Sequence, residues 1–429
     1  MEKAQDIKKT VKEGMKMRGK KYWVGCISLL LLALVVMPLV GGSYYAKEAA
    51  GPKTLKIGTV SPISGPLGVI GLTWGRGFNL CADWLNEQGG LKVGGDRYQI
   101  KFLHEDSKAS PEAAAAAANK LVYQDKVNFV IGDVLNPCSE AVYSVTKPAG
   151  VLHVLLYTMD PYREDQWGLG PDNPLLVLHM PTITLSYDSF FKYLHKTYPN
   201  VKKLVYGVAN GTFTRMVKEA VDTAEATGFK VVGGETLDYG WTDFYPFMTA
   251  LLKNKPDAIF IIHGGGPDLV AVEIKAAREL GFKGPIMSLG SASPLLIPTT
   301  VGAANSYDII CNQAYGSAPE ATKMMKEVKK RWEAKYPGEV FIDDALMAWD
   351  EVWVLAQGIE KANSLEPEAV LKALEGMSKP GSLKTTFGPG CMGGLKTLGV
   401  NRMLVRPFPV TVVQGGKISM VKWVTPELP

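Results

Sequence analysis

The fold is decided by the stretch LKIGTVSPISGPLGVIGLTWGRGFNLCADWLNEQGGLKVGGDRYQIKFLH, residues 55–104. It begins with a predicted strand, Leu55–Val60, and continues into a predicted helix, Leu72–Asn86, that carries apolar side chains on one face and ends at Gly89-Gly90. A second apolar strand, Tyr98–His104, follows. Short apolar strands that alternate with helices predict a parallel sheet whose faces the helices cover.

The same alternation continues along the chain and then begins again. A loop rich in Gly, Pro and Asp, residues 160–174, separates a first run of elements from a second run that starts at the strand Leu204–Val208. Two runs of this kind predict an α/β fold with two Rossmann-like lobes, each built on a parallel sheet. The other predicted strands are 127–132, 151–156, 230–235, 258–262, 285–289, 410–413 and 418–423, and the other predicted helices are 113–123, 139–146, 212–226, 244–253, 268–280, 320–336, 345–362 and 366–376.

Composition and charge narrow the class of protein. The 429 residues are 46% hydrophobic and 21% charged, which is typical of a folded globular chain and excludes a disordered, collagen-like or polytopic membrane protein. Residues 1–46 hold eight Lys/Arg against three Asp/Glu, an excess that equals the whole net charge of +5. The rest of the chain is therefore neutral, and no nucleic-acid partner is expected.

The N-terminal residues have the order of a secretory leader. Four basic residues between Lys16 and Lys21 precede a stretch without charge, Tyr22–Ala46, that contains a dense apolar core and the small residues Gly41-Gly42-Ser43. We therefore predict that residues 1–46 are a signal peptide with an N-terminal extension, and that the body is periplasmic or otherwise extracytoplasmic. The alternative is an uncleaved membrane anchor, because Tyr22–Val40 is long enough to span a bilayer.

No pattern indicates a metal, a cofactor or an active site. The body cysteines, Cys81, Cys138, Cys311 and Cys391, are widely spaced and are interpreted as buried free thiols, although one disulfide is an open alternative. The sequence His263-Gly264-Gly265-Gly266 matches the oxyanion motif of esterases, but the chain contains no G-x-S-x-G nucleophile motif. We predict a protein that is not an enzyme.

The order and spacing of several short motifs resemble the branched-chain amino-acid-binding family. These proteins are the extracytoplasmic solute receptors of ABC importers and have the type I periplasmic binding protein fold. The motifs are Ser64-Gly65-Pro66, Asn86–Gly90, Glu105-Asp106-Ser107, Val130-Ile131-Gly132, Ala276–Phe282 and Ala348-Trp349-Asp350-Glu351.

The resemblance implies two lobes joined by three crossing segments, with a ligand held between the lobes. The crossings are expected near His179–Leu185, Ile309–Tyr315 and Met403–Val410. The N-terminal lobe is then residues 54–180 with 311–407, and the C-terminal lobe is residues 181–310 with 408–429. Such a cleft agrees with the tendency of open α/β sheets to bind ligands at the carboxyl ends of their strands, and with closure about a hinge.

In the first lobe, the resemblance implies that the loop Asp133–Ser139 holds a ligand carboxylate through a hydroxyl and backbone N–H groups at a helix N-terminus. The candidates there are Asn136, Cys138 and Ser139, and Ser139 either donates its hydroxyl to the ligand or caps the helix. Pro137 weakens the site because it has no N–H. After the fourth strand, Tyr157 would narrow the pocket, and the family's threonine position falls on Met159, or on Thr158 if the loop slips by one residue.

In the second lobe, the family's contact positions fall on Phe213, on Gly265 within a triglycine, and on Gly290. The acidic residue that pairs with a ligand amino group is absent from residues 289–292. The first helix adds Trp74 and Arg76, which could stack on a ligand and hold its carboxylate. The alternative is that Trp74 belongs to the core and Arg76 to the solvated surface.

The sequence therefore predicts an exported solute-binding protein of an ABC transporter. Its ligand is expected to be amino-acid-like, an apolar or aromatic carboxylate, or an amide, and its partner is a membrane permease. We expect a monomer. The alternative function is a ligand-sensing receptor domain for a membrane kinase or chemoreceptor.

Overall fold

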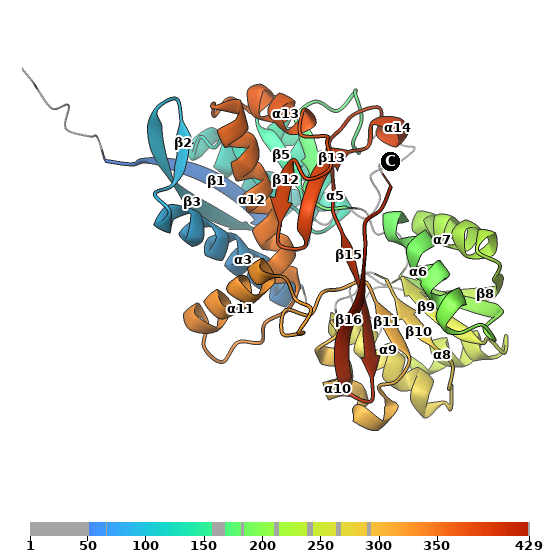
Figure 1. Ribbon diagram of the computed structural model, residues 1–429. Coiled ribbons are helices and arrows are strands. Elements are labelled where there is room, and N and C mark those ends of the chain that lie inside the picture. Colours follow the sequence, from blue (N-terminus) through green and yellow to red (C-terminus); the bar gives the residue numbers. More distant parts are fainter. Residues whose placement is uncertain are drawn as a thin grey trace, which may run out of the picture. The chain divides into compact units, whose positions relative to one another are not determined.

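The computed structural model describes residues 51–65, 67–156, 168–181, 184–209, 214–237, 243–262, 267–289 and 293–427. The predicted leader lies outside these residues. The described residues form two sheets, each with helices packed against it (Figure 1). None of the helices in these ranges is both long enough and apolar enough to cross a membrane.

The first sheet has nine strands in the order β12-β13-β14-β6-β5-β4-β1-β3-β2. Its centre is parallel, because β1 pairs in parallel with β3 and β4, and the parallel pairing continues through β5 and β6 to β14. The remaining strands pair antiparallel at the two edges. The strand bounds are β1 (Lys53–Ser61), β2 (Leu91–Val93), β3 (Asp96–Asp106), β4 (Phe129–Gly132), β5 (Leu152–Leu155), β6 (Leu176–Leu178), β12 (Leu383–Thr385), β13 (Gly388–Gly393) and β14 (Met403–Val405).

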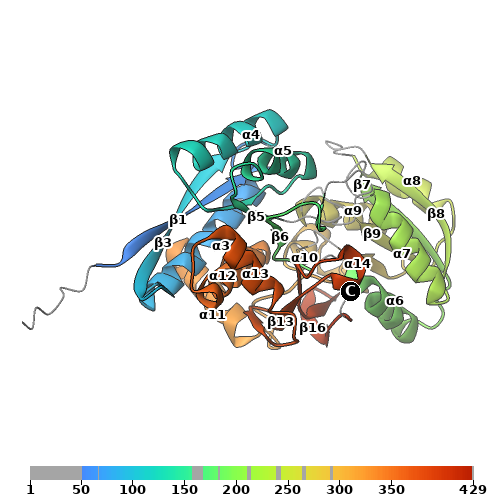
Figure 2. The ribbon, with the colours of Figure 1, turned by 90° about the horizontal axis from the view of Figure 1, so that it is seen from above.

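Helices cover both faces of this sheet (Figure 2). One face is covered by α3 (Gly68–Glu87), α11 (Lys323–Lys335), α12 (Asp344–Ala362) and α13 (Pro367–Glu375), and the other by α4 (Pro111–Asn119) and α5 (Asn136–Thr146). Helix α3 packs on the sheet because Trp74, Phe78 and Cys81 lie on one side of it, and all three side chains are fully buried.

The second sheet has seven strands in the order β16-β15-β11-β10-β9-β7-β8. It is parallel from β8 to β11, and β15 and β16 add antiparallel strands at one edge. The strand bounds are β7 (Lys203–Ala209), β8 (Lys230–Leu237), β9 (Ala258–Ile262), β10 (Ile286–Ser288), β11 (Ile309–Cys311), β15 (Phe408–Gln414) and β16 (Lys417–Val424). Its helices are α6 (Thr184–Thr197), α7 (Thr214–Ala226), α8 (Tyr245–Leu252), α9 (Pro267–Glu279) and α10 (Leu296–Val301).

The chain passes from one sheet to the other three times. It leaves the first sheet after β6, returns to it after β11, and leaves it again between β14 and β15. This topology confirms the predicted α/β class with two parallel-dominated sheets and three crossing segments. The exact residues at which one lobe ends and the other begins stay a prediction.

Several elements were not predicted from the sequence. Helix α6 was missed, although Phe190, Phe191 and Leu194 recur at helical spacing. The strands β12, β13 and β14 were also missed, because β12 and β14 have three residues each and β13 is rich in glycine. Beyond α4, the predicted helix continues as a turn of π-helix, Lys120–Gln124. The interpretation of the cysteines is confirmed, since Cys81, Cys138, Cys311 and Cys391 are free and buried.

Candidate functional site

The polar loops of the first sheet gather at the carboxyl ends of its parallel strands. Ser61, the last residue of β1, lies opposite Asp106 of β3, and Val60 lies opposite Gly132 of β4. Asp106 accepts hydrogen bonds from the Ile63 amide (3.1 Å) and the Ser64 hydroxyl (2.5 Å), which ties two of these loops together.

The loop between β4 and α5 is closed by its own hydrogen bonds. The hydroxyl of Ser139 accepts from the Asp133 amide (2.9 Å) and donates to the Asp133 carbonyl (2.8 Å). The Asp133 carboxylate accepts from the Leu135 amide (3.0 Å). Gly132 begins the loop with a φ of +143°, and a Cβ at this position would lie 2.0 Å from the Val60 carbonyl oxygen. Only glycine therefore fits where the strand turns into the loop.

Helix α5 begins at Asn136 and has no side chain that caps its first turn. Its first i→i−4 bond runs from the Ser139 amide to the Leu135 carbonyl (2.8 Å), so the amides of Asn136 and Cys138 come before the helical hydrogen-bond pattern. Pro137 has no N–H to offer. A helix N-terminus with amides outside that pattern favours an anionic group.

The loop itself carries a buried carboxyl, that of Asp133. Asp133 is fully buried, and burial raises its pKa to about 6, against the opposing effect of the Ser107 hydroxyl and nearby backbone N–H groups. His153 on β5 is also fully buried, and one of its ring nitrogens contacts the Gly132 carbonyl. Burial lowers the pKa of His153 to about 4, so the imidazole is neutral at physiological pH.

The three candidates on α5 differ in their surroundings. Asn136 is 7% exposed at the first helical position. Cys138 is 1% exposed and packs in the apolar cluster between α4 and α5, where burial raises the pKa of its thiol to about 12. Ser139 is 1% exposed, and its hydroxyl makes both of its hydrogen bonds to the Asp133 backbone. It therefore stabilises the loop and does not cap α5, whose N-cap residue is Leu135.

The two candidates on α3, Trp74 and Arg76, contact residues outside this loop. Trp74 is fully buried in the main core of the first sheet. The Arg76 guanidinium lies 3.0 Å from the Glu339 carboxylate and over the rings of Trp332 and Tyr336, at 5.7 and 5.2 Å from their centres. Its side chain is 28% exposed. In this arrangement, Arg76 already has a carboxylate partner.

The remaining candidates, Tyr157, Thr158, Met159, Phe213, Gly265 and Gly290, lie outside the described residues. The strands that lead to them are described, however. Leu155 ends β5, Ala209 ends β7, Ile262 ends β9 and Ser288 ends β10. Each of these candidates therefore follows the carboxyl end of a parallel strand, which is where open α/β sheets bind ligands.

Sequence reasoning gave no role to the buried polar residues Ser107, Asp133 and His153. The signal for two of them was their position, because Ser107 and Asp133 come directly after the strands β3 and β4. His153 lies within an apolar strand and offered no such signal. In the part of the chain that the structure describes, no group of three or more His, Cys, Asp or Glu could hold a metal ion.

Known proteins resemble this chain both in sequence and in structure. Residues 54–417 match a family described as "Periplasmic binding protein". A protein of Pseudomonas aeruginosa described as a leucine-, isoleucine-, valine-, threonine- and alanine-binding protein is 26% identical over 346 residues, which cover 79% of this chain and 86% of that protein.

Two solved structures show the same fold. A branched-chain amino acid transporter substrate-binding protein from Streptococcus pneumoniae, in complex with isoleucine, superposes with a TM-score of 0.70 at 21% identity and covers 87% of this chain and 100% of that one. A solute-binding protein of an ABC transporter from R. palustris, in complex with 4-hydroxybenzoate, superposes with a TM-score of 0.71 at 21% identity and covers 87% and 98%.

Proposed function

Since the chain belongs to the periplasmic binding protein family, we propose that it is the extracytoplasmic receptor of an ABC importer and that it binds a small organic solute. The observation that carries this proposal is the position of the candidate loops. In both sheets they follow the carboxyl ends of parallel strands, and three chain segments connect the two sheets. Binding by closure about these connections needs no bond to be made or broken in the solute.

The proposed binding site combines loops from both sheets. Asn136 and Ser139 lie in the first turn of α5, after the loop that follows β4, and the amides at the start of this helix would receive a carboxylate. The other proposed contacts come from the loops after β5, β7, β9 and β10, namely Tyr157, Thr158, Met159, Phe213, Gly265 and Gly290. Cys138 contributes through its backbone amide, because its thiol packs in the core.

The proposed ligand is a small carboxylate whose remaining part is apolar or aromatic. Support comes from the relatives, one described as an amino-acid-binding protein and one solved with 4-hydroxybenzoate. Residues 289–292 carry no acidic side chain. An α-ammonium group that is buried without a carboxylate loses its hydration uncompensated, which disfavours a free amino acid relative to an aromatic acid or an amide.

A thermal-shift screen of the exported protein tests this proposal. The panel contains leucine, valine, benzoate, 4-hydroxybenzoate, short aliphatic carboxylates and the matching amides, and calorimetry follows each compound that stabilises the fold. We expect an aromatic or apolar acid to bind more tightly than leucine or valine. Sub-micromolar affinity for either amino acid would contradict the argument from residues 289–292.

The compounds that bind in this screen also test two further points, the absence of catalysis and the role in import. A compound that binds should be recovered unchanged after prolonged incubation with the protein. Its uptake by cells should fall when the protein is deleted and return when it is restored. Turnover of the compound, or uptake that persists without the protein, would contradict the proposed function.

The proposed contact of Arg76 with a ligand carboxylate has its own test. Glu339 competes with a ligand carboxylate for the guanidinium, so Glu339→Gln should strengthen binding of an acid and Arg76→Ala should abolish it. If both variants bind the acid as the wild type does, Arg76 belongs to the surface and its partner is Glu339 alone.

A further inference from the structure

Helix α12 carries three buried acidic side chains near the points where the chain passes between the sheets. Asp343, at its N-cap, is 6% exposed, and Asp350 and Glu351 are 1% and 0% exposed. Burying a carboxylate costs free energy unless it pairs with another polar or charged group. Two of the three, Asp350 and Glu351, each contact a different connecting segment.

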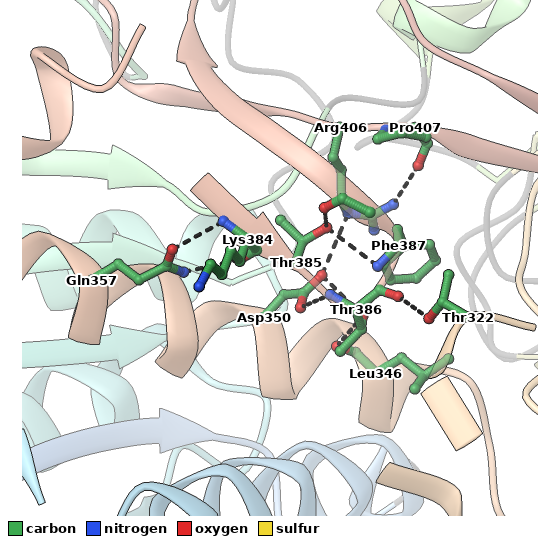
Figure 3. Close-up of polar contacts among 11 residues, drawn as sticks. Thr322, Leu346, Asp350, Gln357, Lys384, Thr385, Thr386, Phe387, Arg406 and Pro407 are labelled. Atoms are coloured by element: carbon green, nitrogen blue, oxygen red, sulfur yellow. Dashed lines mark hydrogen bonds and ion pairs between the residues drawn. The ribbon is translucent and has the colours of Figure 1, made fainter. Parts of the chain in front are cut away.

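The connection between β14 and β15 consists of Arg406 and Pro407, and it is held by Asp350 (Figure 3). The Arg406 guanidinium, from a residue that is 3% exposed, lies 3.7 Å from the Asp350 carboxylate and 3.4 Å from the centre of the Phe387 ring. Asp350 is fixed in turn by Thr386, whose amide (2.7 Å) and hydroxyl (3.0 Å) both donate to it. The charge of Arg406 has no other acidic partner within 4 Å among the described residues.

The connection after β6 begins with His179, which contacts Glu351. The Nδ1 of His179 donates to the Glu351 carbonyl (3.0 Å) and lies 3.8 Å from its carboxylate. Both side chains are fully buried. Burial lowers the pKa of His179 to about 4 and raises that of Glu351 well above its usual value, so both groups are held neutral.

The N-terminal half of α12 therefore reaches two of the three connections. Both contacts come from one turn of a helix that is itself packed in the core of the first sheet.

We propose that Asp350 and Glu351, together called the α12 clamp, fix the connecting segments after β14 and after β6 to the first sheet and set the geometry in which the two sheets close on a ligand. The proposal rests on the proposed function. Within it, Asp350 and Arg406 are positioning residues: they do not touch the ligand, but they determine how the segment between β14 and β15 leaves the first sheet. Movement is then confined to the side of each connection that faces the second sheet.

Amide hydrogen exchange tests the clamp without any ligand. Asp350→Asn keeps the shape of the side chain and removes the charge opposite Arg406. Its single acceptor oxygen keeps one of the two bonds that Thr386 donates. We expect exchange in residues 403–411 to become faster by about tenfold or more, because local opening of the segment becomes easier, while β4 and β9 keep their protection. Asp350→Asn with Arg406→Met removes both charges and should restore part of the protection.

The matched control is the pair Arg402–Glu375, at 2.6 Å, which joins α13 to the chain just before β14. Glu375→Gln should leave exchange in residues 403–411 as in the wild type. If Asp350→Asn does not fold, Thr386→Val replaces it as the test variant. This substitution leaves the charges of Asp350 and Arg406 in place and removes only the hydroxyl that donates to Asp350. Unchanged exchange in residues 403–411, or equally faster exchange in all strands, would overturn the clamp.

Ligand binding provides the second readout. With whichever acid stabilises the wild type, Asp350→Asn should weaken affinity by about tenfold, and Glu375→Gln should not. Faster exchange with unchanged affinity would overturn the positioning role. If no compound of the panel binds the wild type, the proposed function is contradicted, and the exchange experiment alone decides whether the clamp exists.

Discussion

Ser139 shows how one hydroxyl can hold a binding loop. It accepts from the Asp133 amide and donates to the Asp133 carbonyl, and both of these backbone groups are buried. A loop that is fixed in this way presents the start of α5 in one geometry. This matters for ligand binding, because amides that are already oriented need no ordering when an anion arrives.

Ser139→Ala is therefore expected to destabilise the fold by about 1–3 kcal/mol, since two buried backbone groups lose their partner. Urea denaturation measures the change. Ser144→Ala is the control on the same helix, because the Ser144 hydroxyl bonds the Ala141 carbonyl in an exposed position. Equal stability of the two variants would show that the Ser139 bridge contributes little.

At the scale of residues, the sequence indicates which loops matter better than which side chains face a ligand. The order of motifs located the loop after β4, but Cys138 and Trp74 pack in cores. Their direction depends on the rotation of a helix against its neighbours, and a pattern of residue types cannot determine that for small or amphipathic side chains.

The turn from β4 into its loop is an element whose geometry depends on one glycine. Gly132→Ala should destabilise the protein by about 2 kcal/mol or more, because the new Cβ meets the Val60 carbonyl oxygen and φ is positive. Thermal unfolding measures this. Gly150→Ala is a matched control, since Gly150 also has a positive φ, +68°, but a Cβ added there would have no neighbouring atom within 4 Å. A Gly132→Ala protein as stable as Gly150→Ala would contradict the argument.

Helix α11 is joined to α3 by ion pairs on its exposed side, and its buried side packs against apolar side chains. Arg331 pairs with Glu87 (2.9 Å) and Lys335 with Asp83, both across to α3. Trp332, between them in the sequence, is fully buried against Tyr336 and Phe341. Exposed ion pairs contribute about 0–1 kcal/mol, whereas a buried tryptophan contributes several.

Trp332→Ala should accordingly lower the free energy of unfolding by about 3–5 kcal/mol, and Lys335→Met by less than about 1 kcal/mol. Chemical denaturation of the two variants gives the comparison. A larger loss for Lys335→Met would mean that charge, and not packing, fastens α11.

At the scale of elements, the central parallel strands and long amphipathic helices could be predicted, because each is a continuous apolar pattern. The strands β12, β13 and β14 could not. They have few residues, and β14, which joins the other two to the sheet, pairs with β6, more than two hundred residues earlier in the chain. Such distant pairing leaves no local periodicity.

The buried titratable groups give the whole molecule a dependence of stability on pH. Burial raises the pKa of Asp133 to about 6 and that of Glu273, in α9, to about 8. The pKa values of Asp343 and Glu351 are raised as well. Each carboxyl keeps its proton in the folded chain at a pH where the unfolded chain has lost it, so its contribution to stability falls as the pH rises through that interval.

His153 and His179 act in the opposite sense, but only between their lowered pKa values of about 4 and the ordinary value of histidine. Because these raised carboxyls outnumber the two histidines, the free energy of unfolding should decrease as the pH rises from about 5 to about 8. Denaturation in urea at a series of pH values measures the slope. A stability that rises over this interval would contradict the argument.

Glu273→Gln should flatten the upper part of this profile. A group that is protonated only in the folded state contributes a slope of about 1.4 kcal/mol per pH unit, and this substitution removes one such group. Glu225→Gln, on the exposed side of α7, serves as the control and should leave the slope unchanged. An identical profile for wild type and Glu273→Gln would show that Glu273 is not the source.

The three passages of the chain between the sheets affect both the order in which the sheets form and the result of a peptide cleavage. The first sheet receives β14 from residues 403–405, and the second receives β15 and β16 only after that. The second sheet therefore cannot be completed before all strands of the first sheet have been made. A single peptide cleavage in any connection would also leave two fragments that each lack strands held by the other, so the halves cannot be separated as independent folding units.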